Sequence, residues 1–163
     1  MARPAAVAAD GNIKVFWVTT LTLGAPTVAQ LNAGTDISYY LSADGFSPSI
    51  NEAIITDDRL ADIQTFENKG RFQYSVGDLK YVYNPNSSPD NAAYTALVNG
   101  TIGYLVLRFG LPSATAWATA QKVDIWPVIL GTQLKQPPAQ NSVLHVQQKA
   151  FVNNQVTLDV AVA

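Results

Sequence analysis

The stretch that decides the fold is Ile13-Lys14-Val15-Phe16-Trp17-Val18-Thr19-Thr20, a run of β-branched and aromatic residues near the start of the chain. Its apolar residues do not alternate regularly with polar ones, so both faces of the expected strand are apolar. A strand of this kind is buried from both sides. Residues 102–109 have the same property and predict a second strand that is buried on both faces.

Further strands are predicted towards the end of the chain. Residues 143–152 and 155–162 alternate apolar and polar side chains, which is typical of strands with one buried face. Asn153-Asn154 between them suits a two-residue hairpin turn. Residues 122–134 also have strand character, and Pro127 within them indicates an edge position or a bulge.

The strand expected over residues 71–83 contains a change of side-chain parity. Its apolar residues occupy one parity before Gly77-Asp78 and the opposite parity after it. A tight hairpin or one extra residue in a β-bulge would produce this change. The bulge is favoured, because neither half would make a convincing strand pair alone.

Two short helices and one more short strand complete the expected elements. Thr27 caps or opens the first helix, and Gly34 suits a left-handed cap at its end. The second helix covers residues 90–98, and residues 37–41 form the short strand. The predicted fold class is therefore mainly β, an antiparallel β-sandwich or half-barrel with a flanking short α-helix.

The length of 163 residues predicts one ordinary domain, or at most two very small ones. Residues 1–12 are Ala-rich and aperiodic and are expected to form an N-terminal arm, whereas residues 13–163 form a single β domain. Within this domain, residues 42–69 form a long loop excursion, with some strand near residues 49–55. In the window 52–67 five carboxylates oppose Arg59, which gives a net charge of −4.

Charged residues are scarce, at 13% of the chain against about 25% in an average soluble domain. This scarcity is either a quirk of composition or a sign that other protein covers much of the surface. The formal charge of −2 argues against a protein that grips the nucleic-acid backbone. No signal peptide or membrane-spanning segment is expected, and the chain contains no cysteine.

The residues that could support chemistry give weak patterns. His145 is the only histidine and lies within a strand, so a surface or interface role is favoured over a Ser-His-Asp triad. Asp57, Asp58 and Asp62 lack the spacing of a calcium loop, and a solvated or interfacial acidic loop is the default. The aromatic residues between 39 and 83 fall at strand spacing, which favours sheet packing over a base- or sugar-stacking platform. No catalytic residue, metal or cofactor is predicted.

Several segments, taken in order along the chain, form a recognisable set. They are Ile13-Lys14-Val15-Phe16-Trp17-Val18, Asn32-Ala33-Gly34-Thr35-Asp36-Ile37-Ser38-Tyr39-Tyr40-Leu41, Asp57-Asp58-Arg59-Leu60, Gly70-Arg71-Phe72, Tyr81-Val82-Tyr83-Asn84-Pro85, Gly103-Tyr104-Leu105-Val106 and Gln121-Lys122-Val123-Asp124. Together they resemble the major tail tube proteins of long-tailed bacteriophages, especially those that infect actinobacteria. The similarity runs over residues 3–160, and no single motif carries it.

The resemblance implies a structural virion protein whose subunits form hexameric rings that stack into a hollow tail tube. It implies an inner β-barrel built from six subunits, with a long loop and terminal arms that reach the next ring. Its implied partners are further copies of itself and the tape-measure, tail terminator and distal tail proteins. Double-stranded DNA would pass through without stable binding. The protein would be made in the bacterial host cytoplasm, without membrane insertion, and would reside in the virion tail.

Two groups of residues are predicted to serve this assembly. Contacts between rings or subunits are expected from Arg3, Pro4, Asp57, Asp58, Arg59 and Asp62. The channel is expected to be lined by Gln73, Ser75, His145, Gln147 and Lys149. Two alternatives remain open: another phage β-sandwich protein, such as a capsid decoration protein or the inner tube of a contractile system, and a carbohydrate-binding β-sandwich module. The latter would use exposed Trp17, Trp117 or Trp126, although Trp17 and Trp126 lie in expected strands.

Overall fold

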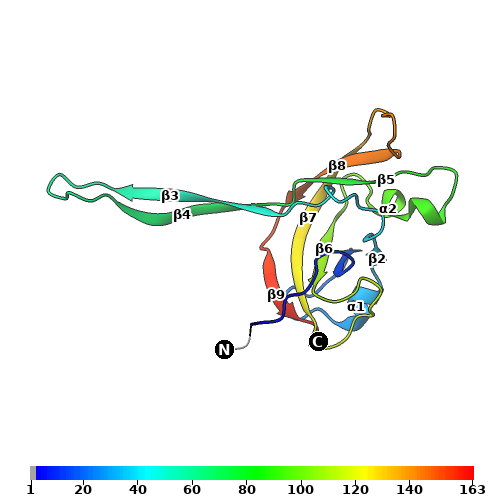
Figure 1. Cartoon of the computed structure of the whole chain (residues 1–163), viewed down its shortest axis with the longest axis horizontal. Coiled ribbons are helices and arrows are strands. Elements are labelled where there is room, and N and C mark those ends of the chain that lie inside the picture. The colour runs from blue at the N-terminus through cyan, green and yellow to red at the C-terminus, as the bar shows by residue number, and fades with distance from the viewer. Residues whose placement is uncertain (1–2) are drawn as a thin grey trace.

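One long strand organises the main sheet. In the computed structural model, which describes residues 3–163, this strand is β7 (Lys122–Lys135), and β6 (Ile102–Phe109) pairs along one of its edges. Its other edge binds β8 (His145–Val152) and β9 (Thr157–Ala161). β1 (Ile13–Val18) follows β6, and the full order is β2-β1-β6-β7-β8-β5, with β9 attached to β7 (Figure 1). All pairings are antiparallel.

The sheet curls until its two ends approach each other. β2 (Thr35–Asp36) lies at one end and β5 (Asp78–Val82) at the other. The amide of Val82 donates to the carbonyl of Tyr40 at 2.8 Å, and the segment that contains Tyr40 begins beside β1. Two short helices, α1 (Val28–Asn32) and α2 (Ala92–Ala96), flank the sheet, and the 3-10 turn η1 (Pro89–Asn91) precedes α2. The predicted mainly β, antiparallel half-barrel with a short helix is confirmed.

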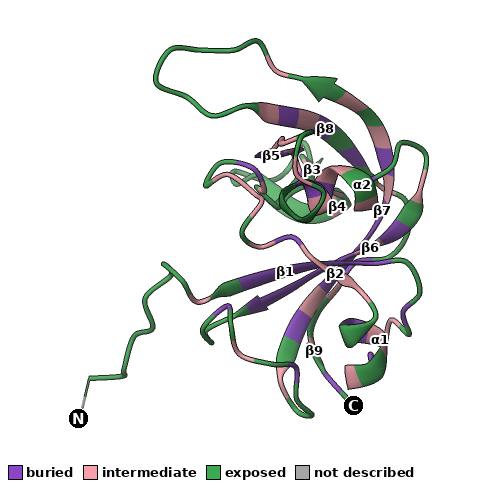
Figure 2. Ribbon diagram, turned by 90° about the vertical axis from the view of Figure 1, so that its right-hand side faces the viewer, coloured by how far each residue is buried: buried purple, intermediate pink, exposed green. Residues whose placement is uncertain are grey.

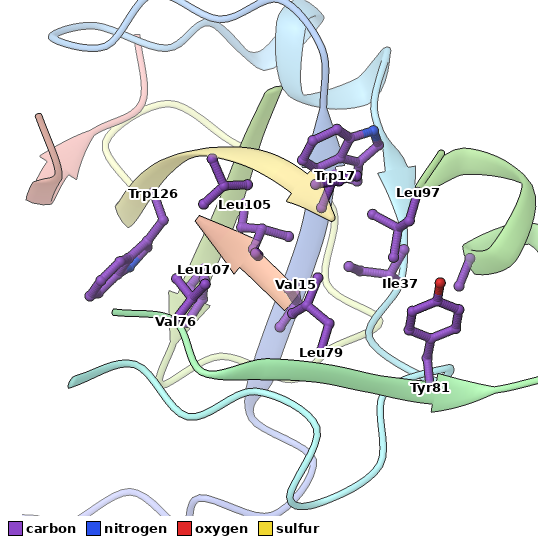
Figure 3. Packing of buried hydrophobic residues seen from close by; sticks show 14 of the residues in the cluster. Val15, Trp17, Ile37, Val76, Leu79, Tyr81, Leu97, Leu105, Leu107 and Trp126 are labelled. Carbon is purple, nitrogen blue, oxygen red and sulfur yellow. The ribbon is translucent and has the colours of Figure 1, made fainter. Parts of the chain in front are cut away.

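Both faces of the central strands are buried, as the sequence predicts (Figure 2). Val15 and Trp17 pack into one apolar cluster, which Figure 3 shows, whereas Phe16 and Val18 pack into a second cluster on the opposite face. Trp126 of β7 belongs to the first cluster. Burying an aliphatic or aromatic side chain of this kind contributes roughly 1.5–3 kcal/mol. The two clusters therefore fix β1, β6 and β7 as the rigid centre of the molecule.

A two-stranded hairpin projects from the body and forms a separate sheet (Figure 1). Its strands are β3 (Ser49–Asp57) and β4 (Phe66–Ser75), and Gly70 and Arg71 together oppose Ala53 in a β-bulge. A Cβ on Gly70 would lie 2.8 Å from the carbonyl oxygen of Ala53, so glycine permits the bulge. The region predicted as a long loop with a strand near 49–55 is thus mostly hairpin. Every residue of β3 and β4 except Asp57, Gly70 and Tyr74 is exposed, so no buried face marked it as sheet.

The predicted single strand over residues 71–83, with its bulge, is wrong. β4 ends at Ser75 in the hairpin, and β5 begins at Asp78 in the main sheet, where it pairs with β8. Between them, Gly77 adopts a φ of +68°, a left-handed conformation that glycine tolerates best. The change of parity therefore marks a crossing from one sheet to the other.

The predicted hairpin of residues 143–152 and 155–162 is also wrong. β8 and β9 do not pair with each other, because both lie antiparallel to β7, one after the other along the same edge. Pro127 is not on an edge strand either. Pro127 lies on β7 between the residues that pair with β8, which begin at Val128, and those that pair with β9, which end at Ile125. Neither strand pairs with β7 at this position, so the N–H that proline lacks is not needed for a hydrogen bond between strands. The backbone amide of Asn153, which lies between β8 and β9, donates to the carbonyl of Pro127 at 3.2 Å.

The region around the first helix agrees with the sequence only in part. Thr27 and Gln30 form a reciprocal capping box at the start of α1, as expected of Thr27 as a cap. Gly34 is not a left-handed cap, because the conformation at the end of α1 is right-handed. Its role is close packing, since a Cβ there would lie 2.7 Å from the carbonyl oxygen of Trp17. The strand expected at 37–41 is reduced to β2 at Thr35–Asp36 and a single bridge at Leu41.

Candidate assembly surface

The tip of the hairpin brings together four of the predicted contact residues. Asp57, Asp58, Arg59 and Asp62 all lie at or next to the turn between β3 and β4. Arg59 pairs with Asp57 at 3.0 Å, and its Nε also donates to that carboxylate at 3.1 Å. Leu60 and Ile63 stand beside these charges and are fully exposed. The tip therefore presents two aliphatic side chains among carboxylates.

The shaft of the hairpin is also unusually apolar for an exposed ribbon. Alternation along β3 and its register with β4 place Ile50, Ile54, Phe72 and Tyr74 on one face. Tyr74 packs edge-on against Trp126 of the body at 5.4 Å between ring centroids, and Phe72 packs edge-on against Tyr74. Ile50 and Ile54 on this face are exposed. Glu52 and Lys69 form an ion pair on the same face, which supports this register.

The other face of the shaft is polar near the body and apolar near the tip. Asn51 and Gln73 face each other at the base, whereas Ile55 lies on this face closer to the tip. Phe66, opposite Asp57, lies there too and is exposed. A ribbon with exposed apolar residues on both faces has more apolar surface than its own body can cover.

The five predicted channel residues lie at the hairpin base and on β8. His145, Gln147 and Lys149 share the face of β8 opposite the buried Val146, Gln148 and Ala150, as the alternation predicts. Gln73 and Ser75 lie on β4. Residues Gln73, Ser75 and Lys149 line one open groove of about 820 Å³ between β4 and β8, which we call the hairpin groove. The fold thus brings three of the five candidates together.

The remaining predicted contact residues lie in the N-terminal segment. Arg3 and Pro4 are exposed and outside any helix or strand, and residues 1 and 2 of the predicted arm lie outside the described residues. The arm joins the body at a turn in which the amide of Asn12 donates to the carbonyl of Ala9 at 3.1 Å. Asn12 and Gly11 in turn accept backbone hydrogen bonds from Gly110 and Ser113, so the described part of the arm is anchored to the body at its end.

A second groove, which the sequence did not indicate, lies where the arm meets the body. This groove, about 470 Å³ in volume, is called the arm groove. Its lining is mainly apolar, and its characteristic residues are Ile13, Tyr39, Leu41, Phe46, Leu107 and Phe109. The hydroxyl of Tyr39 lies 2.8 Å from Oγ of Ser113, which fixes one wall. Ile13 and Phe109 are register partners across β1 and β6, and both are exposed.

Buried polar side chains hold β8 to its neighbours. Gln148 is fully buried, and its amide donates to the carbonyls of Leu97 and Gly131 at 2.9 and 2.8 Å. The hydroxyl of Tyr81 donates to Oε1 of Gln148 at 3.0 Å and accepts from Gln133. Burial raises the pKa of Tyr81 to about 12, against the hydrogen bond from Gln133, which lowers it. This network ties β5, β7 and β8 to the end of α2.

Two buried cations position the loop between β6 and β7. Lys14 and Arg108 are register partners, are 6% and 1% exposed, and lie against the ring of Trp117. Lys14 donates to the carbonyl of Thr115 at 3.0 Å, and Arg108 donates to the carbonyl of Pro112 at 2.8 Å. Burial lowers the pKa of both groups, while the carboxylate of Asp36 opposes the shift. In the sequence, these two buried cations are recognisable only as one charged residue in each of two otherwise apolar strands, β1 and β6.

Within residues 3–163, no group of three or more His, Cys, Asp or Glu side chains is arranged to hold a metal ion. No helix in this part of the chain is long and apolar enough to cross a membrane. Trp17, Trp117 and Trp126 are all buried, so the tryptophans that a sugar-binding module would expose are not available at the surface.

The chain's sequence matches a family described as phage tail tube protein over residues 1–163. The chain belongs to this family. No curated protein matches its sequence. Among solved structures, a chain in the cryo-EM structure of the anti-feeding prophage baseplate is similar, with a TM-score of 0.55 and 12% identity. The match covers 96% of this chain and 97% of the other, and it shows a common fold. The protein is therefore a structural component of phage tails. The narrower resemblance to phages of actinobacteria stays a prediction.

Proposed function

We propose that this tail tube protein forms hexameric rings that stack into a hollow tube, through which the phage genome leaves the virion. The observation that carries the proposal is the β3–β4 hairpin, which projects from the body with apolar residues on both faces (Figure 1). An isolated two-stranded hairpin is marginally stable in water. Its exposed apolar residues therefore need a partner outside the chain, and in a homopolymer that partner is another copy.

Three further features support repeated self-association. Only 13% of the residues are charged, so much of the surface lacks the charges that keep monomers apart. Within the described residues, β2 pairs only with β1 and β9 only with β7, so each leaves one strand edge that ring closure can cover. The similar chain belongs to a baseplate described as 6-fold symmetrised, which supports a ring of six.

The channel wall is proposed to include Gln73, Ser75, His145, Gln147 and Lys149. These residues line the hairpin groove or the polar face of β8 and include one cation, Lys149. The amide of Gln147 donates to the carboxylate of Asp78 at 2.6 Å, which places an acidic group beside them. Because a basic wall would hold DNA through its phosphates, a nearly neutral wall keeps the genome mobile. The tape-measure protein would occupy the channel before the DNA, and the tail terminator and distal tail proteins would bind the tube ends.

The acidic hairpin tip is proposed to contact the neighbouring ring. Changing Asp57 and Asp58 to Asn should weaken stacking or make it less sensitive to salt, because screening acts on those charges. Tube length measured at rising salt concentrations tests this, with Asp90→Asn, at an exposed position of η1, as the control. Equal hydrogen exchange of residues 42–69 in free subunits and tubes would contradict the contact.

A second candidate is the inner tube of a contractile system, with which the similarity to a baseplate chain of the anti-feeding prophage is equally compatible. Both candidates predict stacked rings, and they differ in whether a sheath binds outside. A non-catalytic role within the virion tail, after synthesis in the host cytoplasm, is part of both proposals.

Assembly of the purified protein tests the proposed function. Sedimentation at increasing concentration should show large polymers, and negative-stain electron microscopy should show them as hollow tubes. The matched control is a chain in which Ile54, Ile55 and Phe66 are changed to Asn, because these side chains are exposed and belong to neither buried cluster. It should stay folded and monomeric. Equal polymer formation by this variant would contradict the role of the hairpin.

A further inference from the structure

The hairpin tip and the arm groove are complementary surfaces that cannot meet within one chain. Leu60 and Ile63 at the tip are fully exposed, whereas the arm groove is a mainly apolar depression in the body. β3 is 9 residues long, so the hairpin carries its tip about 30 Å from its base. Figure 1 shows that it extends away from the body and from the N-terminal segment.

We propose that the hairpin tip of one copy docks into the arm groove of a second copy, an inference that rests on the proposed function. A protrusion that fits a depression elsewhere on the same molecule makes a heterologous contact, which propagates head to tail. Each copy then offers one tip and one groove, so every copy can bind two others. This contact therefore identifies the receiving site for the hairpin.

Charge favours this contact over pairing of two tips. Tip-to-tip contact would bring Asp57, Asp58 and Asp62 of both copies together, and like charges in contact disfavour association. The arm groove has Asp10 as its charged lining residue, and its other lining residues are apolar or neutral. The arm lines this groove through residues 9–11 and also carries Arg3, an exposed cation opposite in charge to the carboxylates of the tip. Leu60 and Ile63 would enter the groove while the carboxylates stay at its edge.

Aromatic residues make the groove a suitable receptor. Tyr39 is 76% exposed although its hydroxyl is held by Ser113, so its ring is fixed without being covered. Phe109 and Ile13, which also line the groove, form an exposed cross-strand pair. Rigid apolar side chains bind a partner with little loss of conformational entropy. The hairpin groove is a less suitable receptor, because five of its lining residues are the polar side chains of Gln73, Ser75, Lys149, Asn154 and Gln155.

Disulfide cross-linking tests the proposal, because the chain contains no cysteine of its own. One chain carries Ala61→Cys at the tip, which leaves Leu60 and Ile63 in place. The second chain carries Ala43→Cys in the arm groove, and a matched third chain carries Gln155→Cys in the hairpin groove; all three positions are exposed. Equimolar mixtures are oxidised and analysed on non-reducing gels, and each chain alone reports contacts between identical sites.

The mixture of Ala61→Cys with Ala43→Cys should form disulfide dimers, at least about tenfold more than its mixture with Gln155→Cys. Adding Leu60→Asn and Ile63→Asn to the tip chain should reduce these dimers at least about tenfold, because each lost aliphatic contact weakens binding by that order. Equal or greater linkage to position 155, or undiminished linkage after the two Asn changes, overturns the docking site.

Electron microscopy of the unmodified chain separates this result from the proposed function. If tubes form and linkage to position 43 is absent, the docking site is wrong and the tube function stands. If no tubes form at any concentration but linkage to position 43 is specific, the docking stands and the tube function is wrong. If both fail, both proposals are rejected.

Discussion

Replacing Gln148 with leucine should destabilise the free subunit far more than the same change at the neighbouring Gln147 of β8. Leucine keeps apolar volume but removes the amide that binds the carbonyls of Leu97 and Gly131 and the hydroxyl of Tyr81. A buried polar group that loses its partner costs about 1–3 kcal/mol. The Gly131 carbonyl is only partly buried, so water can replace the lost donor there. We therefore expect a loss of about 3–5 kcal/mol from the remaining two groups and the poorer fit of leucine.

Urea unfolding of the unassembled subunit measures this loss. The midpoint should fall while the dependence on urea stays similar, because the surface exposed on unfolding hardly changes. The control is Gln147→Leu, the next residue on β8, whose amide reaches the exposed carboxylate of Asp78. That change should cost less than about 1 kcal/mol. If Gln148→Leu costs less than about 1 kcal/mol, the network does not hold β8 in place.

Three other changes test separate parts of the structure. Gly34→Ala should cost about 1–3 kcal/mol in urea unfolding, because its Cβ would lie 2.7 Å from the carbonyl oxygen of Trp17, whereas Gly24→Ala meets nothing within 4 Å and should be nearly neutral. Stability should fall by about 2–3 kcal/mol between pH 10 and 12, because tyrosine in the unfolded chain loses its proton near its ordinary pKa of 10.0, whereas the pKa of Tyr81 in the folded chain is about 12. Tyr81→Phe should lack this part of the fall, and an unchanged pH profile would contradict the buried hydroxyl. Deleting residues 2–7 should leave stability within about 0.5 kcal/mol but reduce tube formation seen by electron microscopy, and normal tubes would show that the arm is dispensable.

The buried strands could be predicted from the sequence because burial leaves a pattern. Residues 13–18 and 102–109 contain continuous apolar runs, and both form strands with two buried faces. The alternation in residues 143–152 likewise identified the buried side of β8. In each case the packing inside one chain determines the residue type at each position.

Pairing partners could not be predicted in the same way. Residues 143–152 and 155–162 are each recognisable as strands, but nothing local shows that both bind β7 rather than each other. The chain leaves one sheet for the other at Gly77, but the sequence there resembles a β-bulge. A change of sheet and an extra residue both shift the apolar side chains from odd to even positions, or the reverse. These outcomes depend on contacts between segments far apart in the chain.

The assembly surface, too, could be predicted from the sequence only in part. The acidic tip was recognisable from its charge, and Asp57, Asp58, Arg59 and Asp62 do lie together. The arm groove was not recognisable, because its walls come from the arm, β1, β6 and the segment after β2. Selection for contacts with another copy leaves no periodicity within one chain, so exposed residues such as Leu60 resemble an ordinary loop.

The most direct test of the central claim is electron cryomicroscopy of the polymer that the purified protein forms. The proposal predicts a hollow tube whose end-on views have sixfold symmetry and whose reconstruction places each hairpin against a neighbouring copy. A protein that stays monomeric at all concentrations, with or without a nucleating tail component, would contradict the claim. A polymer without a central channel would contradict it equally.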